Sequence, residues 1–176
     1  MTDIAFRSAE ASDAEAIARL HVAVWRRTYR DLAPADAFAT LDEPYRLKRW
    51  QEKLAHPQPD QLVLLAESVG RLVGIGAAGA PSEEAFDSRG EIKFLYVDGE
   101  FKRQGIGRRL LKRLALHLSA HRYPGAALSV VEGNHAAAAF YEALGARVIG
   151  RHVDAGPIWR SQNIIMAWDG FDELIQ

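Results

Sequence analysis

Cysteine is absent from the 176 residues, and this absence excludes disulfide bridges, thiolate metal sites and a cysteinyl acyl intermediate. A chain without disulfides suits a reducing cytosol, so we expect a cytoplasmic location. The N-terminus lacks a basic stretch followed by an apolar core, and no apolar run approaches the length of a membrane span. We therefore expect a soluble protein with no membrane partner.

The length and composition limit how the chain is divided. With 48% hydrophobic and 26% charged residues, the chain is long enough for one well-buried core and too short for two comfortable domains. It contains no internal repeat and no linker. We expect a single domain over 1–176.

Charge is distributed unevenly, although the net charge is only -1. No acidic residue occurs between Glu100 and Glu132, and this stretch carries a cluster of basic residues. The cluster consists of Lys102, Arg103, Arg108, Arg109, Lys112, Arg113 and Arg122. Such a segment is either a solvated helix face or an attractor for a polyanionic small ligand. Nucleic acid is a weaker alternative because no aromatic residues are interleaved for stacking, and we expect no nucleic-acid partner.

A strand pattern over 91–97 leads through a basic, glycine-bearing turn directly into a helix pattern over 105–121. The turn reads Lys102-Arg103-Gln104-Gly105-Ile106-Gly107. Its glycines let the backbone curl without Cβ clashes. The first-turn amides of the helix lack intrahelical partners, and the helix dipole adds partial positive charge. The pattern predicts an anion site that fits a pyrophosphate, although an ordinary strand-to-helix turn also uses glycines.

Several familiar motifs are missing. A dinucleotide fingerprint needs a small residue where this chain has Leu110 and an acidic residue near Leu128 and Ser129. No Walker ending of Gly-Lys-Ser/Thr and no Gly-x-Ser-x-Gly elbow occurs. His117 and His121 have the i, i+4 spacing of zinc ligands, but no glutamate stands between them and no third ligand is placed. We expect no metal.

Hydrophobic periodicity predicts an alternating order of strands and helices. Strands are predicted over 4–7, 61–68, 71–78, 91–97, 127–131, 147–153 and 163–168, and helical regions over 12–27, 36–54, 105–121 and 134–144. A capping box of Ser12 and Glu15 opens the first helix. The polar, acidic stretch 81–90 is predicted to be a loop. The order βααβββαβαββ indicates a mixed α/β fold.

Two segments in this order resemble the GNAT superfamily of N-acetyltransferases. The glycine turn is similar to the family's acetyl-CoA loop, Gln/Arg-x-x-Gly-x-Gly/Ala, with Lys102 in the first slot. The second segment runs from Asn134 through Phe140-Tyr141 to Leu144-Gly145, with Ala146 where an aromatic residue is usual. The resemblance covers nearly the whole chain. It implies a central mixed, mostly antiparallel sheet of about seven strands with helices on both faces.

The resemblance also implies which residues bind acetyl-CoA. The main chain near Leu95, Tyr96 and Val97 would pair with the pantetheine arm as another strand does, and a β-bulge here would expose those groups. Asn134 would contact the cofactor arm, with Tyr141 near the thioester. The phosphate-binding loop would comprise Lys102, Arg103, Gln104, Gly105, Ile106, Gly107 and Arg108. On spacing alone, Asn134 is a helix cap and Tyr141 a packed aromatic.

Two residues take catalytic roles by this resemblance. Tyr141 is the expected general acid, because a phenol of pKa near ~10 can protonate a departing thiolate whose acid has a pKa near ~8.5. Glu91 is the expected base, relayed by water, because an amine of pKa near ~10.4 must lose a proton before it attacks. A strand-end charge facing solvent is the alternative for Glu91.

The acceptor is expected to be a primary amine of a small molecule or peptide. The family pattern places candidates for its site between the first two helices, the long strand and the final strand connection. These candidates are Trp25, Tyr29, Glu84, Asp87, His152 and Trp159. A non-catalytic, CoA-binding regulatory module is the alternative function, and a homodimer stays open.

Overall fold

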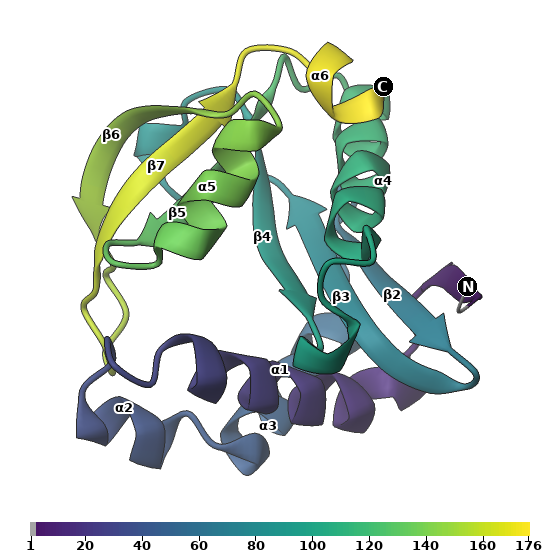
Figure 1. The fold of residues 1–176 in the computed structure, drawn as a ribbon, viewed down its shortest axis with the longest axis vertical. Coiled ribbons are helices and arrows are strands. Elements are labelled where there is room, and N and C mark those ends of the chain that lie inside the picture. Colours follow the sequence, from purple (N-terminus) through teal and green to yellow (C-terminus); the bar gives the residue numbers. More distant parts are fainter. Residues whose placement is uncertain (1–2) are drawn as a thin grey trace.

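The computed structural model describes residues 3–176 and contains one seven-stranded sheet in the order β1-β2-β3-β4-β5-β7-β6 (Figure 1). Its strands are β1 (Ile4–Ser8), β2 (Leu62–Ser68), β3 (Arg71–Gly79), β4 (Gly90–Val97), β5 (Ala126–Val131), β6 (Arg147–Val153) and β7 (Gln162–Trp168). Only β4 and β5 pair in parallel among the described strands. The predicted mixed, mostly antiparallel sheet is therefore confirmed.

Helices cover both faces of this sheet, as predicted. They are α1 (Ala14–Thr28), α2 (Ala35–Thr40), α3 (Glu43–Ala55), α4 (Ile106–Ala120), α5 (His135–Ala143) and α6 (Asp172–Ile175). On one face, Leu110, Leu114 and Leu118 form a fully buried stripe of α4 at helical spacing. On the other, Ile17 of α1 and Trp50 of α3 pack against β2 and β3. No helix within 3–176 is long and apolar enough to cross a membrane.

The helical region predicted over 36–54 is two helices, not one. The chain turns at Leu41 and Asp42, and the Asp42 carboxylate accepts a hydrogen bond from the Tyr45 amide at 2.9 Å. Pro44 occupies the first turn of α3, where a missing N–H does no harm. An N-cap followed by proline therefore starts a new helix inside an otherwise continuous apolar pattern.

The stretch 81–90 is also more ordered than a plain loop. It contains the short 3₁₀ helix η2 (Glu84–Phe86), and the Phe86 side chain is only 1% exposed. Phe86 packs against Ala127 of β5 and Ile165 of β7. The single aromatic residue in a polar stretch anchors the connection over the sheet because burial of its ring is favourable.

The predicted capping box of Ser12 and Glu15 is wrong. The capping box lies two residues earlier: Glu10 is the N-cap of the 3₁₀ helix η1 (Ala11–Asp13), and the Asp13 carboxylate accepts a hydrogen bond from the Glu10 amide at 2.7 Å. Asp13 therefore takes the role predicted for Glu15, and α1 begins directly after η1. The Asp13 carboxylate also binds Arg7.

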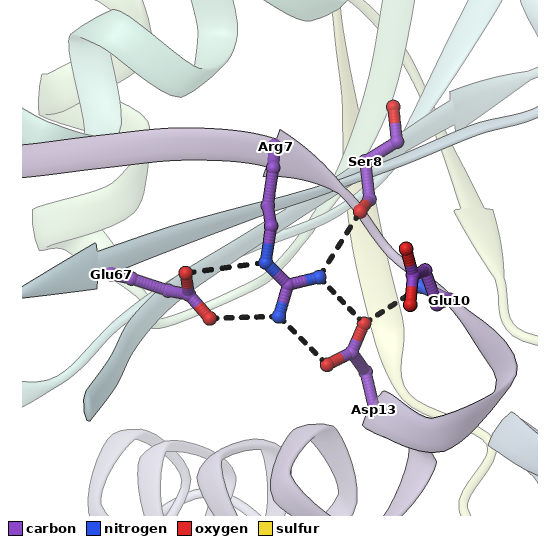
Figure 2. A network of polar contacts seen from close by, with 5 residues as sticks. All are labelled: Arg7, Ser8, Glu10, Asp13 and Glu67. Atoms are coloured by element: carbon purple, nitrogen blue, oxygen red, sulfur yellow. Dashed lines mark hydrogen bonds and ion pairs between the residues drawn. The ribbon is translucent and has the colours of Figure 1, made fainter. Parts of the chain in front are cut away.

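Arg7 joins β1, β2 and the start of α1 in one polar network (Figure 2). Its guanidinium donates to the Asp13 carboxylate at 2.8 and 2.9 Å and to the Glu67 carboxylate at 2.8 and 3.2 Å. Hydrogen bonds from Arg7 hold the pKa of Asp13 below its usual value. This bidentate geometry fixes the sheet edge that leads into α1.

Candidate functional site

The sheet opens between its two parallel strands. Within residues 3–176, β4 pairs with β5 only at Gly90 with Ala126 and Glu91 with Ala127. Beyond these positions the two strands diverge. In Figure 1, α5 lies in front of β5, and α4 lies on the opposite side of β4 from α5. The main chain at the far end of β4 therefore lacks the neighbour that a closed sheet would provide.

A β-bulge lies on β4 at the start of this opening. The register between β3 and β4 shifts between Ala77 and Ala78, so that Lys93 is the extra residue on β4. The shift reverses the side-chain alternation: Ile92 packs in the core beneath α4, and Phe94 packs in the core beneath α1. The structure thus contains the feature needed to present β4 main-chain groups to a ligand.

Leu95 and Val97 present their main-chain groups to the opening. The Asp98 amide donates to the Val73 carbonyl of β3 at 2.8 Å. Bonded and non-bonded pairs alternate along antiparallel strands, so the N–H and C=O of Val97 and Leu95 point away from β3. They face the side where β5 has moved away. An extended ligand could pair with them as an added strand does.

The N-terminus of α4 lies after the end of β4. Gly105 is its N-cap, with φ of +76° in the left-handed region that favours glycine, and no side chain caps the first turn. A Cβ at Gly107 would lie 3.5 Å from Phe140 of α5 and 3.8 Å from Val97 of β4. Lys102 and Arg103 are exposed beside it. These uncapped amides, the helix dipole and the two cations form a site suited to phosphate.

The basic cluster predicted from the sequence divides in the structure. The guanidinium carbons of Arg109 and Arg113 lie 4.5 and 4.1 Å from the Phe6 ring centroid, so both side chains pack against β1. His117 and His121 each have a ring nitrogen against a backbone carbonyl, at 2.7 and 2.9 Å. Among residues 3–176, no cluster of three or more potential ligands is placed to hold a metal ion.

Asn134 and Tyr141 come from the two ends of α5. The Asn134 carbonyl oxygen accepts from the Ala137 amide at 3.3 Å and caps the helix. Asn134 also borders a cavity of about 570 Å³ at the end of β5. Tyr141 is 9% exposed, and burial, with a smaller effect of Tyr29, raises the pKa of its phenol. Tyr141 therefore stays protonated at neutral pH.

Glu91 is not a free surface carboxylate. Its Oε2 accepts hydrogen bonds from the Ser82 amide at 2.8 Å and from the Lys93 ammonium at 3.0 Å. Its side chain is only 14% exposed. Glu91 and Lys93 are two residues apart on β4, and their side chains pair on the same side of the strand.

Three of the six acceptor-site candidates form one aromatic cluster. The Trp25 and Tyr29 rings of α1 lie 6.0 and 5.4 Å from the Trp159 ring, which comes from the connection between β6 and β7. Phe38 of α2 joins them at 5.1 Å from Trp25. Phe38 was not among the predicted acceptor-site residues; it lies on α2, which the apolar pattern does not separate from α3.

The other three candidates lie against different partners. Glu84 and Asp87 are exposed on and beside η2. His152 of β6 has its Nε2 2.7 Å from the Ser129 hydroxyl and its ring 6.2 Å from Phe86. The structure thus groups the aromatic candidates and leaves Glu84, Asp87 and His152 outside that group.

A sheet opened between two parallel strands, with an uncapped helix N-terminus beside it, is a site suited to an extended ligand that carries phosphate. The chain belongs to the acetyltransferase (GNAT) family, whose model matches residues 25–146. This confirms the resemblance seen in the glycine turn and the Asn134 segment.

Similar proteins agree with this assignment. A probable N-acetyltransferase of Mycobacterium tuberculosis, Rv2775, is 31% identical over 154 residues, which cover 85% of this chain and 83% of the relative. The uncharacterized N-acetyltransferase YuaI of Bacillus subtilis is 29% identical over 131 residues, covering 74% and 73%. The crystal structure of the PaiA N-acetyltransferase of Thermoplasma acidophilum with coenzyme A has the same fold, with a TM-score of 0.77 at 20% identity over 95% of this chain and 99% of that one.

Proposed function

We propose that the protein transfers an acetyl group from acetyl-CoA directly to a primary amine of a small molecule or peptide. The observation that carries this proposal is the opening between β4 and β5, where the main chain of Leu95 and Val97 is unpaired next to the uncapped N-terminus of α4. The coenzyme A complex of the similarly folded PaiA enzyme supports it.

The residues present fit the parts of acetyl-CoA. Leu95 and Val97 would hydrogen-bond the amides of the pantetheine arm in the manner of an added strand. The amides from Gly105 to Arg108, with Lys102 and Arg103 nearby, would bind the pyrophosphate. An N–H of the β4 segment would polarise the thioester carbonyl. Asn134, at the cap of α5, would contact the arm from the side of β5.

Tyr141 is proposed to protonate the departing thiolate. Its raised pKa keeps the phenol protonated but makes proton transfer harder by itself. The same dry surroundings also disfavour the thiolate anion, which raises the pKa of the leaving group and offsets this effect. A neutral phenol therefore suits the role of general acid here.

Glu91 is proposed to accept the proton of the attacking ammonium through water. We expect Glu91→Gln to lower kcat/KM at pH 7 by about 10-fold or more, with a smaller loss at pH 9.5 because more of the amine is already neutral. Lys93→Met, which removes the ammonium partner and leaves the carboxylate, is the matched control. A loss that is the same at both pH values would assign Glu91 a purely structural role.

The reaction is expected to be sequential, with both substrates bound before transfer. Cysteine is absent, and the serine hydroxyl that contacts a histidine, Ser129 with His152, lies beside Phe86 and outside the aromatic cluster. Initial rates of thiol release, measured with a panel of primary amines, should give intersecting double-reciprocal lines. Parallel lines, or a competent acetylated enzyme seen by mass spectrometry, would contradict direct transfer. Binding of acetyl-CoA without thiol release for any amine would instead indicate a non-catalytic CoA-binding module.

A further inference from the structure

Two buried N–H groups on facing helices have no hydrogen-bond partner. Among the described residues, the buried side-chain nitrogen and oxygen atoms without a partner are His21 Nε2 on α1 and Arg46 Nε on α3. His21 and Trp25 are one turn apart on α1, and Arg46 and Trp50 are one turn apart on α3. The Trp50 indole bonds His21 and the Arg46 guanidinium lies 5.8 Å from the Trp25 ring, so the two groups lie on facing sides of the two helices, about one turn apart. An unpaired buried donor is costly, and the fold has one on each of the two facing helices.

Both groups are donors. The Trp50 indole N–H donates to His21 Nδ1 at 3.0 Å, so Nδ1 is the acceptor and Nε2 carries the proton of the neutral ring. Burial, and then the charge of Arg46, holds the pKa of His21 well below its usual value, so the ring stays neutral. A guanidinium has donors only. Both N–H groups therefore need a hydrogen-bond acceptor. The positive charge of Arg46 favours an acceptor that is an anion.

No carboxylate of this chain fills that role. Arg46 takes part in none of the ion pairs among residues 3–176. Both groups lie against aromatic rings. The Arg46 guanidinium lies 5.8 Å from the Trp25 ring. The His21 ring stacks on the Tyr96 ring, with centroids 4.8 Å apart. Arg46 is partly buried, and this desolvation, which lowers the pKa of its guanidinium, is offset by no counter-ion among the described residues.

This donor pair adjoins the proposed reaction centre. Trp25 belongs to the aromatic cluster with Tyr29 and Trp159. The ring that stacks on His21 is Tyr96, which lies on β4 between Leu95 and Val97, the residues whose main-chain groups face the opening. One small molecule could therefore contact the donor pair and present an amine toward the opening of the sheet.

We propose that the acceptor amine carries a compact anionic group, with a carboxylate the simplest case, that is bound by Arg46 and the His21 Nε2–H in the aromatic cluster. This inference rests on the proposed acetyl transfer and specifies the acceptor as an amino acid or a similar amino-carboxylate. It disfavours polyamines and other purely cationic amines, whose charge Arg46 would repel.

The test uses the full chain, saturating acetyl-CoA and matched acceptors: the common amino acids, their primary amides and their decarboxylated amines. Thiol release should show a kcat/KM about 10- to 100-fold higher for the best amino acid than for its amide, as expected for hydrogen bonds to a charged group. This comparison needs no variant. A parent enzyme that uses amides or decarboxylated amines equally well or better, or that acetylates no amino acid, overturns the inference.

Variants then assign the preference to Arg46. Arg46→Gln should bring the carboxylate-to-amide ratio close to one, mainly through KM, with little change in melting temperature because the side chain is only partly buried and has no ion-pair partner among residues 3–176. Arg49→Gln, which removes an exposed charge one turn away on α3, is the matched control and should keep the ratio. A ratio that survives in Arg46→Gln would mean that another group binds the carboxylate, and would overturn the assignment to Arg46.

The outcomes separate this inference from the proposed function. If amines without a carboxylate are acetylated efficiently, acetyl transfer stands and only the anion site is wrong. If acetyl-CoA neither stabilises the protein nor releases thiol with any acceptor, both proposals fail.

Discussion

Tyr141→Phe is expected to slow acetyl transfer by about 10²-fold or more, which corresponds to at least ~2.7 kcal/mol of transition-state stabilisation. The substitution removes the hydroxyl and keeps the buried ring, whose centroid lies 5.2 Å from Phe140 and 6.0 Å from Trp168. Packing should therefore survive, and the melting temperature with acetyl-CoA should change little. Single-turnover transfer at saturating acetyl-CoA is the informative measurement, because slow product release could hide a chemical defect.

Tyr123→Phe is the matched control for this experiment. The Tyr123 hydroxyl donates to the Asp60 carboxylate, on the connection between α3 and β2. Its loss should lower stability by about 1 kcal/mol and leave the transfer rate unchanged. If Tyr141→Phe behaves like Tyr123→Phe, with a transfer rate within about twofold of the parent, Tyr141 packs the core and another group protonates the thiolate.

Gly107→Val is expected to abolish the binding of acetyl-CoA while leaving the protein folded. A Cβ at this position makes only ordinary contacts with Phe140 and Val97. The added γ-methyl groups, however, would stand between α4, α5 and β4, where the phosphates must approach the backbone. In the parent, acetyl-CoA at 100 times its dissociation constant should stabilise the fold by about 2.7 kcal/mol. That corresponds to roughly 5 to 10 °C in melting temperature for a chain of this size.

Gly170→Val controls for the introduction of a β-branched residue. A Cβ at Gly170 meets nothing within 4 Å, in the turn between β7 and α6. This variant should keep the full shift with acetyl-CoA. Gly105 is less useful for the same purpose, because its φ of +76° makes any β-branched residue there strained before a ligand is added. A full acetyl-CoA shift in Gly107→Val would place the phosphates elsewhere.

Local patterns in the sequence were sufficient for most of the fold. The long strand 91–97, the glycine turn and the helix 105–121 all appear within one or two residues of their predicted ends. The spacing of apolar residues indicates which face of a strand or helix is buried. Gly105 indicates a helix cap in the left-handed region. One error occurred where two local signals competed: Glu10 and Asp13 form the capping box that was predicted for Ser12 and Glu15, and the Asp13 carboxylate also binds Arg7.

The candidate site required the tertiary structure. The divergence of β4 from β5 depends on pairing between strands far apart in sequence, and no residue type marks it. Lys93 became the bulge residue for a similar reason, since its register is set by β3. The partly buried position of Arg46 could not be predicted from the sequence, because a cation on an amphipathic helix normally faces solvent. Its unpaired Nε is apparent only once α1 packs against α3.

The most direct test of the account is amide hydrogen exchange, followed by NMR, of the protein with and without acetyl-CoA. The central claim is that acetyl-CoA binds along the open edge of β4 and at the N-terminus of α4. It predicts that acetyl-CoA slows exchange at Leu95 and Val97, whose amides face the opening, and at the amides from Gly105 to Arg108. Protection confined to other parts of the chain, or no protection at millimolar acetyl-CoA, would contradict the claim.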